Sequence, residues 1–205
     1  MKKKNLLLIG LAALILFIII AIQVIFQTPL TNLDKKLNIV MPNIENPNLV
    51  SFFSILGIIF DAKVLTLVVI ILALFLWILK LKKEAYFTSI TMIISALITL
   101  ILKDIFHIAR PLNILIQEVD NSFPSGHARI IVIFTGLLTY LIFNKIKNKT
   151  IRGASICISI FLILLISFSR LYLNAHWLSD VLGGFCIGAF ILSLAILIKE
   201  TLEKY

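Results

Sequence analysis

Long apolar runs, each bounded by charged or turn-forming residues, dominate the chain from end to end. A helix needs about 20 apolar residues to cross the hydrocarbon core of a bilayer. The runs predict six transmembrane helices, at Leu6–Phe26, Val64–Leu79, Ala85–Leu102, Ala128–Phe143, Ala154–Phe168 and Trp177–Ile198. We therefore expect an all-α, polytopic membrane protein with a single domain covering residues 1–205.

The first run follows three lysines, so it has the basic start and apolar core of a secretory signal. It is longer than the roughly 7–15 apolar residues of a signal core, and no Ala-x-Ala cleavage site follows it cleanly. We interpret it as an uncleaved first transmembrane helix.

The pattern changes between the first two spans. Residues 27–47 are polar and include three prolines. Within them, Leu30–Met41 alternates apolar and charged positions, which predicts a short helix lying at the membrane surface. Leu49–Phe60 is apolar but too short to span, so we expect an interfacial or partly inserted helix there.

Composition agrees with a membrane location and narrows the partners. The chain is 60% hydrophobic with a mean hydropathy of +1.10, whereas soluble domains are about 45–50% apolar. The net charge of +9 does not indicate nucleic-acid binding, because Lys and Arg cluster at the ends of apolar runs, as topology signals do. Cys157 and Cys186 lie inside apolar runs and have no metal-ligand spacing.

The distribution of basic residues predicts the orientation. The N-terminus, the 80–83 and 145–152 turns and the C-terminus together hold 12 of the 19 Lys and Arg residues. By the positive-inside rule these segments are cytoplasmic. We expect a protein of the cytoplasmic membrane with both termini inside, and with its other polar segments on the extracytoplasmic side.

Three of those extracytoplasmic segments carry candidate chemistry. His176 and Asp180 are four residues apart and share a face on a helix, so the carboxylate can fix the imidazole tautomer and raise its basicity. Arg170 adds a bidentate donor for an oxyanion. Lys103 and Arg110 are two helical turns apart and share a face if the helix continues as far as Pro111.

The third segment, Pro124-Ser125-Gly126-His127, is a turn that leads into a helix. The free backbone N–H groups of Ser125, Gly126 and His127 can bind an anion there, and glycine lets the backbone come close. Three cations, a hydroxyl, an N–H nest and two histidines suit a phosphoryl group. The cations would hold its oxygens while one histidine attacks and the other protonates the leaving oxygen.

These motifs, in this order and spacing, resemble the three-part signature of the type 2 phosphatidic acid phosphatase superfamily. The resemblance covers about residues 97–184 and implies a metal-independent enzyme that works through a phosphohistidine and needs no cofactor. It implies His176 as nucleophile, Asp180 as its orienting group and His127 as the acid. Phosphate would be bound by Lys103, Arg110, Ser125, Gly126 and Arg170.

A site at headgroup level predicts a lipid phosphate as substrate, with phosphatidylglycerol phosphate, phosphatidic acid and undecaprenyl diphosphate as the candidates. The alternatives are a non-catalytic lipid carrier or scramblase on the same scaffold and a vanadate-dependent haloperoxidase. The haloperoxidase relatives are soluble and lack the spans, and the intact histidines argue against a decayed enzyme. Lipid tail, mono- or diphosphate preference and oligomeric state stay open.

Four further residues have simpler interpretations. Asp104, Glu118 and Asp120 suggest a metal site at first sight, but we interpret them as a solvated loop, since the implied chemistry needs no metal. Arg129 either contacts a headgroup or second phosphate or extends to the membrane interface.

Overall fold

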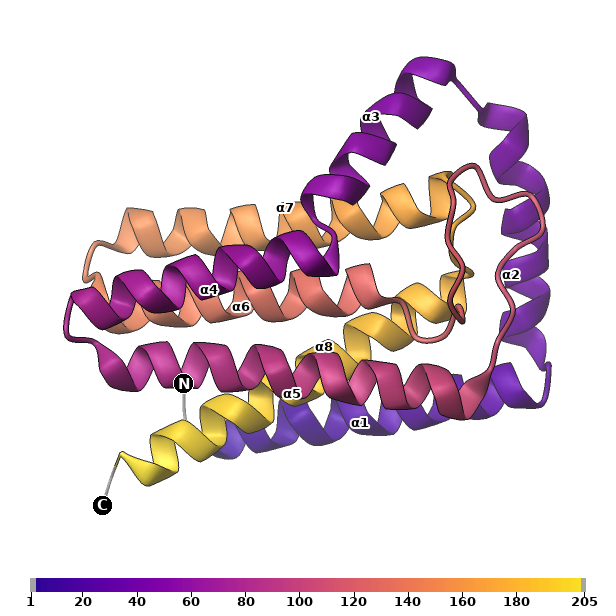
Figure 1. The fold of residues 1–205 in the computed structure, drawn as a ribbon. Coiled ribbons are helices and arrows are strands. Elements are labelled where there is room, and N and C mark those ends of the chain that lie inside the picture. The colour runs from indigo at the N-terminus through magenta and orange to yellow at the C-terminus, as the bar shows by residue number, and fades with distance from the viewer. Residues whose placement is uncertain (1–2, 204–205) are drawn as a thin grey trace.

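The structure, a computed structural model, describes residues 3–203, and these form eight α-helices and one short 3₁₀-helix without any strand (Figure 1). The elements are α1 (Lys3–Ile25), α2 (Pro29–Val40), η1 (Met41–Ile44), α3 (Pro47–Ile59), α4 (Ala62–Ile78), α5 (Lys82–Phe106), α6 (Gly126–Lys145), α7 (Lys149–Tyr172) and α8 (Leu178–Leu202). Each helix expected from the sequence is present, so the all-α fold class is confirmed.

The long helices run back and forth along one direction, and the connections gather at the two ends of the bundle (Figure 1). At one end lie α2, α3, the loop between α5 and α6, and the turn between α7 and α8. The start of α1 and the end of α8 lie at the opposite end. All three polar motifs are therefore placed at the same end of the molecule.

By length and composition, α1, α5, α6, α7 and α8 can each cross a membrane. Helix α4 has 17 residues and follows α3 after a break at which the two helices bend by 42°, so the bent pair is the candidate for a sixth crossing. Large apolar side chains such as Leu74, Leu100 and Phe161 point outward, as expected for surfaces that face lipid. The protein is a multi-pass membrane protein.

Polar side chains fix where several helices begin. Asn46 accepts hydrogen bonds from two backbone N–H groups of α3, and the Asp61 carboxylate accepts one from Lys63 N at 2.8 Å. Ser125 caps α6 by accepting from Ala128 N at 3.4 Å. These caps satisfy N–H groups that have no partner within the helix.

The condition for a shared helical face of Lys103 and Arg110 is not met. The helix would have to continue as far as Pro111, but α5 ends at Phe106 and is capped by His107 in the left-handed conformation, with φ 48°. Arg110 therefore lies on a loop and does not share a helical face with Lys103. Apolar residues follow His107, but the left-handed residue at this position satisfies backbone carbonyl groups of the last turn of α5, so the helix ends there.

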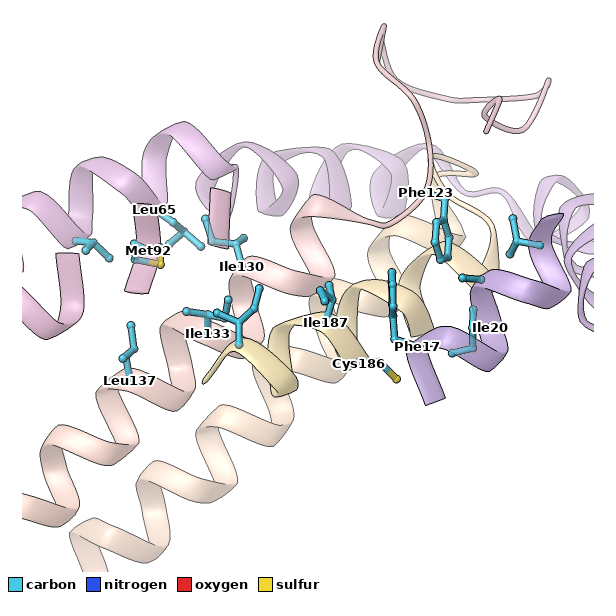
Figure 2. Close-up of a cluster of buried hydrophobic side chains, with 14 residues drawn as sticks. Phe17, Ile20, Leu65, Met92, Phe123, Ile130, Ile133, Leu137, Cys186 and Ile187 are labelled. Carbon is cyan, nitrogen blue, oxygen red and sulfur yellow. The ribbon is translucent and has the colours of Figure 1, made fainter. Parts of the chain in front are cut away.

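The largest buried apolar cluster joins α1, α4, α5, α6 and α8 (Figure 2). Phe123, fully buried, stacks on Phe17 with ring centroids 5.7 Å apart, and so anchors the turn before α6 to α1. At Gly184 a Cβ atom would lie 2.4 Å from the Ser125 carbonyl oxygen. Only glycine lets α8 come this close to the start of α6.

Candidate active site

His176 lies in the turn between α7 and α8 and is 2% exposed. The turn is shaped by Asn174, which adopts a left-handed φ of 52° and donates its side-chain amide to Asn113 O at 3.2 Å. Asparagine tolerates this backbone conformation better than most residues. The turn thus holds the imidazole at the head of α8, inside the protein.

The two ring nitrogens of His176 have different partners. Nδ1 lies 3.2 Å from Asp180 Oδ2, and Nε2 lies 3.3 Å from an Nη1 nitrogen of Arg110. Because a guanidinium can only donate, Nε2 is the acceptor, and the proton of the neutral ring is on Nδ1, facing the carboxylate. The lone pair on Nε2 points toward the cations.

Asp180 is completely buried and holds several groups in place. Its Oδ2 atom accepts from Trp177 N at 2.8 Å and from the Ser122 hydroxyl, as well as facing His176. Oδ1 has no hydrogen-bond partner. Ser122, which the sequence did not single out, therefore joins the loop before α6 to this pair.

Lys103 and Arg110, expected to bind phosphate, are brought together by a carboxylate. Asp120 forms ion pairs with both, one oxygen to Lys103 Nζ and the other to Arg110 Nη2. Arg110 also donates from Nε to Asp120 O at 2.9 Å and from Nη1 to Ala175 O at 2.7 Å. Asp120 therefore occupies the position where the anion was expected. It lies on a loop with a half-exposed side chain, as the sequence predicted, but the sequence did not indicate its ion pairs with the two cations.

The charges around Asp120 show in its pKa. Burial alone would raise this pKa, but the hydrogen bonds and charges of Lys103 and Arg110 lower it to about 2 from 3.8.

The same pair of cations lowers the pKa of His176. Burial lowers the pKa of His176 well below 6.5, and the positive charges of Arg110, Lys103 and Arg170 lower it further. His176 is consequently a neutral imidazole near pH 7, with an unprotonated nitrogen available for attack.

Arg170, in the last turn of α7, is 1% exposed and reaches across to α3. It donates to Phe53 O at 3.2 Å, and a Cβ atom on Gly57 would lie 2.3 Å from its Nη2. Gly57 thus makes room for the guanidinium. Helix α3, which the sequence predicted as an interfacial or partly inserted helix, forms one wall around this cation.

His127 lies in the first turn of α6 and faces α3. Its Nε2 lies 3.2 Å from Gly57 O and 3.9 Å from Asp61 Oδ2. Arg170 and His127 are therefore neighbours through Gly57, although 43 positions separate them in sequence. The sequence contained no signal for this contact, because α3 has no motif of its own.

The turn before α6 differs in one detail from the expected anion nest. The N–H of Ser125 donates to Asp180 O at 2.9 Å, so it is not free to bind phosphate, and the hydroxyl oxygen caps the helix. Gly126 and His127 occupy the first two helical positions, whose N–H groups have no acceptor within the helix. The nest is reduced to these two residues because α8 packs directly on the turn.

The side chain of Arg129 does not extend to the membrane interface. The side chain is 2% exposed and donates from Nη1 to Ser95 Oγ at 2.5 Å, and its Nε atom has no partner. It points into the bundle toward α5 rather than to the membrane interface. No motif predicted this inward direction.

The surface helix α2 contributes a contact that the sequence did not indicate. Asp34, 4% exposed, accepts from Ser179 N at 2.9 Å and so caps α8 from outside that helix. Burial raises the pKa of Asp34, although its hydrogen bonds with Ser179 oppose the shift. This contact holds the helix start that carries Asp180.

Comparison with known proteins gives a consistent result. Residues 84–204, more than half of the chain, match the PAP2 superfamily. An undecaprenyl-diphosphatase from Sulfolobus acidocaldarius is 32% identical over 124 residues, which cover 55% of this chain and 56% of the relative. A putative undecaprenyl-diphosphatase from Escherichia coli is 32% identical over 139 residues, covering 63% of this chain and 66% of that protein. The matched regions thus span between about half and two thirds of these relatives.

The fold has a solved counterpart. A crystal structure of a transmembrane PAP2-type phosphatidylglycerolphosphate phosphatase from Bacillus subtilis superimposes with a TM-score of 0.88 at 20% identity. The match covers 96% of this chain and 98% of the other. At this level of identity the likeness establishes the arrangement of the helices.

Proposed function

The chain belongs to the PAP2 superfamily, and we propose that it is an integral membrane phosphatase that removes a terminal phosphate from a lipid. The observation that carries the proposal is the environment of His176. Its Nδ1 faces a buried carboxylate, while its unprotonated Nε2 faces a guanidinium that belongs to a cluster of cations. A nucleophile beside preorganised positive charge is what attack on a phosphate dianion requires.

The reaction follows from these positions. Nε2 of His176 attacks phosphorus and forms an N–P bond, while the bond from phosphorus to the lipid oxygen breaks and its electron pair stays on that oxygen. His127 gives the oxygen a proton. Water then attacks the phosphohistidine, His127 takes a proton from the water, and inorganic phosphate leaves with His176 restored. Lys103, Arg110 and Arg170 hold the phosphate oxygens, and the N–H of Gly126 supplies a neutral donor.

No divalent ion is needed in this scheme, since three permanent cations neutralise the phosphate charge. We propose that the site faces the extracytoplasmic side of the cytoplasmic membrane. The basic residues of the opposite end support this orientation, because they gather in the turns and termini there.

The substrate class is supported by the position of the site. It lies at one end of the bundle, where a lipid headgroup would lie if the apolar helices span the bilayer (Figure 1). The names of the relatives point to undecaprenyl diphosphate or phosphatidylglycerol phosphate. These two lipids and phosphatidic acid are the substrates we propose to compare.

One experiment tests the proposal against a non-catalytic carrier. Purified protein in detergent is incubated with each of the three lipids in the presence of EDTA, and released phosphate is measured. We expect the wild-type protein to release phosphate from at least one lipid. The His176→Ala variant should release no phosphate from that lipid. A protein that binds or moves these lipids without releasing phosphate would be a carrier, and a strict Mg²⁺ requirement would contradict the mechanism.

A further inference from the structure

We infer that Asp61 is the positioning carboxylate of His127, as Asp180 is for His176. The inference rests on the proposed function, because it assigns a role within that reaction. Asp61 belongs to none of the three motifs and lies at the break between α3 and α4, 66 positions before His127. The fold alone brings the two residues together.

The two oxygens of Asp61 have separate partners. Oδ1 accepts from Lys63 N at 2.8 Å and caps α4, while Oδ2 lies 3.9 Å from His127 Nε2. Among residues 3–203, no other carboxylate oxygen comes within 4 Å of a His127 ring nitrogen. The hydrogen bond that caps α4 restrains the Asp61 side chain. Its second carboxylate oxygen is therefore held toward His127.

The orientation of the ring follows from its second contact. Gly57 O lies 3.2 Å from the same nitrogen, and a carbonyl oxygen can only accept, so Nε2 carries a proton. Nδ1 is then the nitrogen available to the leaving-group oxygen. When Nδ1 is also protonated, the positive ring has a carbonyl dipole and a carboxylate on its far side, which stabilise the acid form.

The stabilisation is needed because a positive charge packs on the other side of Gly57. Arg170 packs on Gly57, the residue whose carbonyl accepts from His127. A guanidinium so close disfavours a second positive charge on the imidazole. Asp61 supplies the opposing negative charge from the solvent-facing side, where its side chain is 39% exposed.

A purely structural role for Asp61, as the cap of α4, makes a different prediction. Asparagine caps a helix about as well as aspartate does. Asp61→Asn therefore keeps the cap and removes only the charge. If the cap is all that matters, the variant behaves like the wild type with every substrate.

The test compares two leaving groups. A lipid phosphomonoester leaves as an alkoxide that needs a proton, whereas nitrophenolate leaves without one. We expect Asp61→Asn to lower kcat by about tenfold on the lipid, a fraction of the 10²–10⁴ that general acid catalysis supplies, and by less than about twofold on nitrophenyl phosphate. Asp104→Asn, which removes an exposed charge at the same end of the bundle, is the matched control and should change neither.

The double variant completes the test. In His127→Ala the acid is absent, so adding Asp61→Asn should cause no further loss on the lipid. Equal losses on both substrates, no loss on the lipid, or independent losses in the double variant would each overturn the inference. A wild-type protein that releases phosphate from neither substrate would instead overturn the proposed function itself.

Discussion

Replacing Asp120 by asparagine should tighten the binding of phosphate rather than weaken it. The carboxylate forms ion pairs with Lys103 and Arg110, so a phosphate group must displace it to reach them. Asparagine is nearly the same size but has no charge to compete with. Replacing a residue at the centre of a binding site usually lowers affinity. An increase in phosphate affinity would therefore distinguish competition by Asp120 from an ordinary loss of contacts.

The magnitude follows from the pKa of Asp120. Its fall from 3.8 to about 2 corresponds to about 2.4 kcal/mol of net attraction to the cations. The side chain is 52% exposed, so screening by solvent reduces this to about 1 kcal/mol. The inhibition constant for orthophosphate should therefore fall about fivefold in Asp120→Asn, and KM for a phosphomonoester should fall with it.

The assay is inhibition of nitrophenyl phosphate hydrolysis by orthophosphate, with Asp104→Asn as a control for the loss of a charge. Because the pKa of Asp120 is lowered, its carboxylate stays ionised even below pH 3.8 and is neutralised only as the pH falls toward 2. The ratio of the inhibition constants of the wild type and Asp120→Asn should thus be constant between pH 5 and 8. Unchanged or weaker inhibition in Asp120→Asn would refute competition and would mean that Asp120 holds the two cations in position for phosphate.

Three other predictions follow from the site. His176→Ala should abolish acid-labile phosphate trapped on the protein after rapid quenching; labelled protein in that variant would place the nucleophile elsewhere. Gly57→Ala should raise the inhibition constant for orthophosphate about tenfold, since the new methyl group must displace the Arg170 guanidinium and weaken its hydrogen bonds; an unchanged constant would remove Arg170 from the phosphate site. In a variant without native cysteines, an impermeant thiol reagent added outside should label Val119→Cys but not Lys147→Cys, both at exposed positions, and the reverse pattern would invert the proposed orientation.

The helices were predictable because a bilayer imposes a simple rule. Each crossing needs a continuous apolar run, and the six runs stand out in the sequence against their charged ends. The motif residues were predictable for a related reason. His176, Asp180, Arg110 and Lys103 are charged or polar groups beside long apolar runs, where such groups are costly unless they have a function.

Helix ends and partners were less predictable. The end of α5 at Phe106 depends on a left-handed His107, and histidine is not a residue that marks this conformation from sequence alone. Arg129 illustrates the same difficulty, because its hydrogen bond to Ser95 joins α6 to α5. Which way a long side chain turns depends on the neighbouring helix, and the local sequence does not contain that helix.

The sequence by itself thus predicted the helices, the end of the bundle at which the motifs meet, and the residues that we propose to handle a phosphoryl group. The tertiary structure decided what surrounds them. Asp120 fills the cation pair, Gly57 leaves room for Arg170, and Asp61 faces His127. The longest of these contacts in sequence is the one between Gly57 and Arg170, which are 113 positions apart. These contacts arise from helix packing and loop closure, which no local pattern of hydrophobic and polar residues encodes.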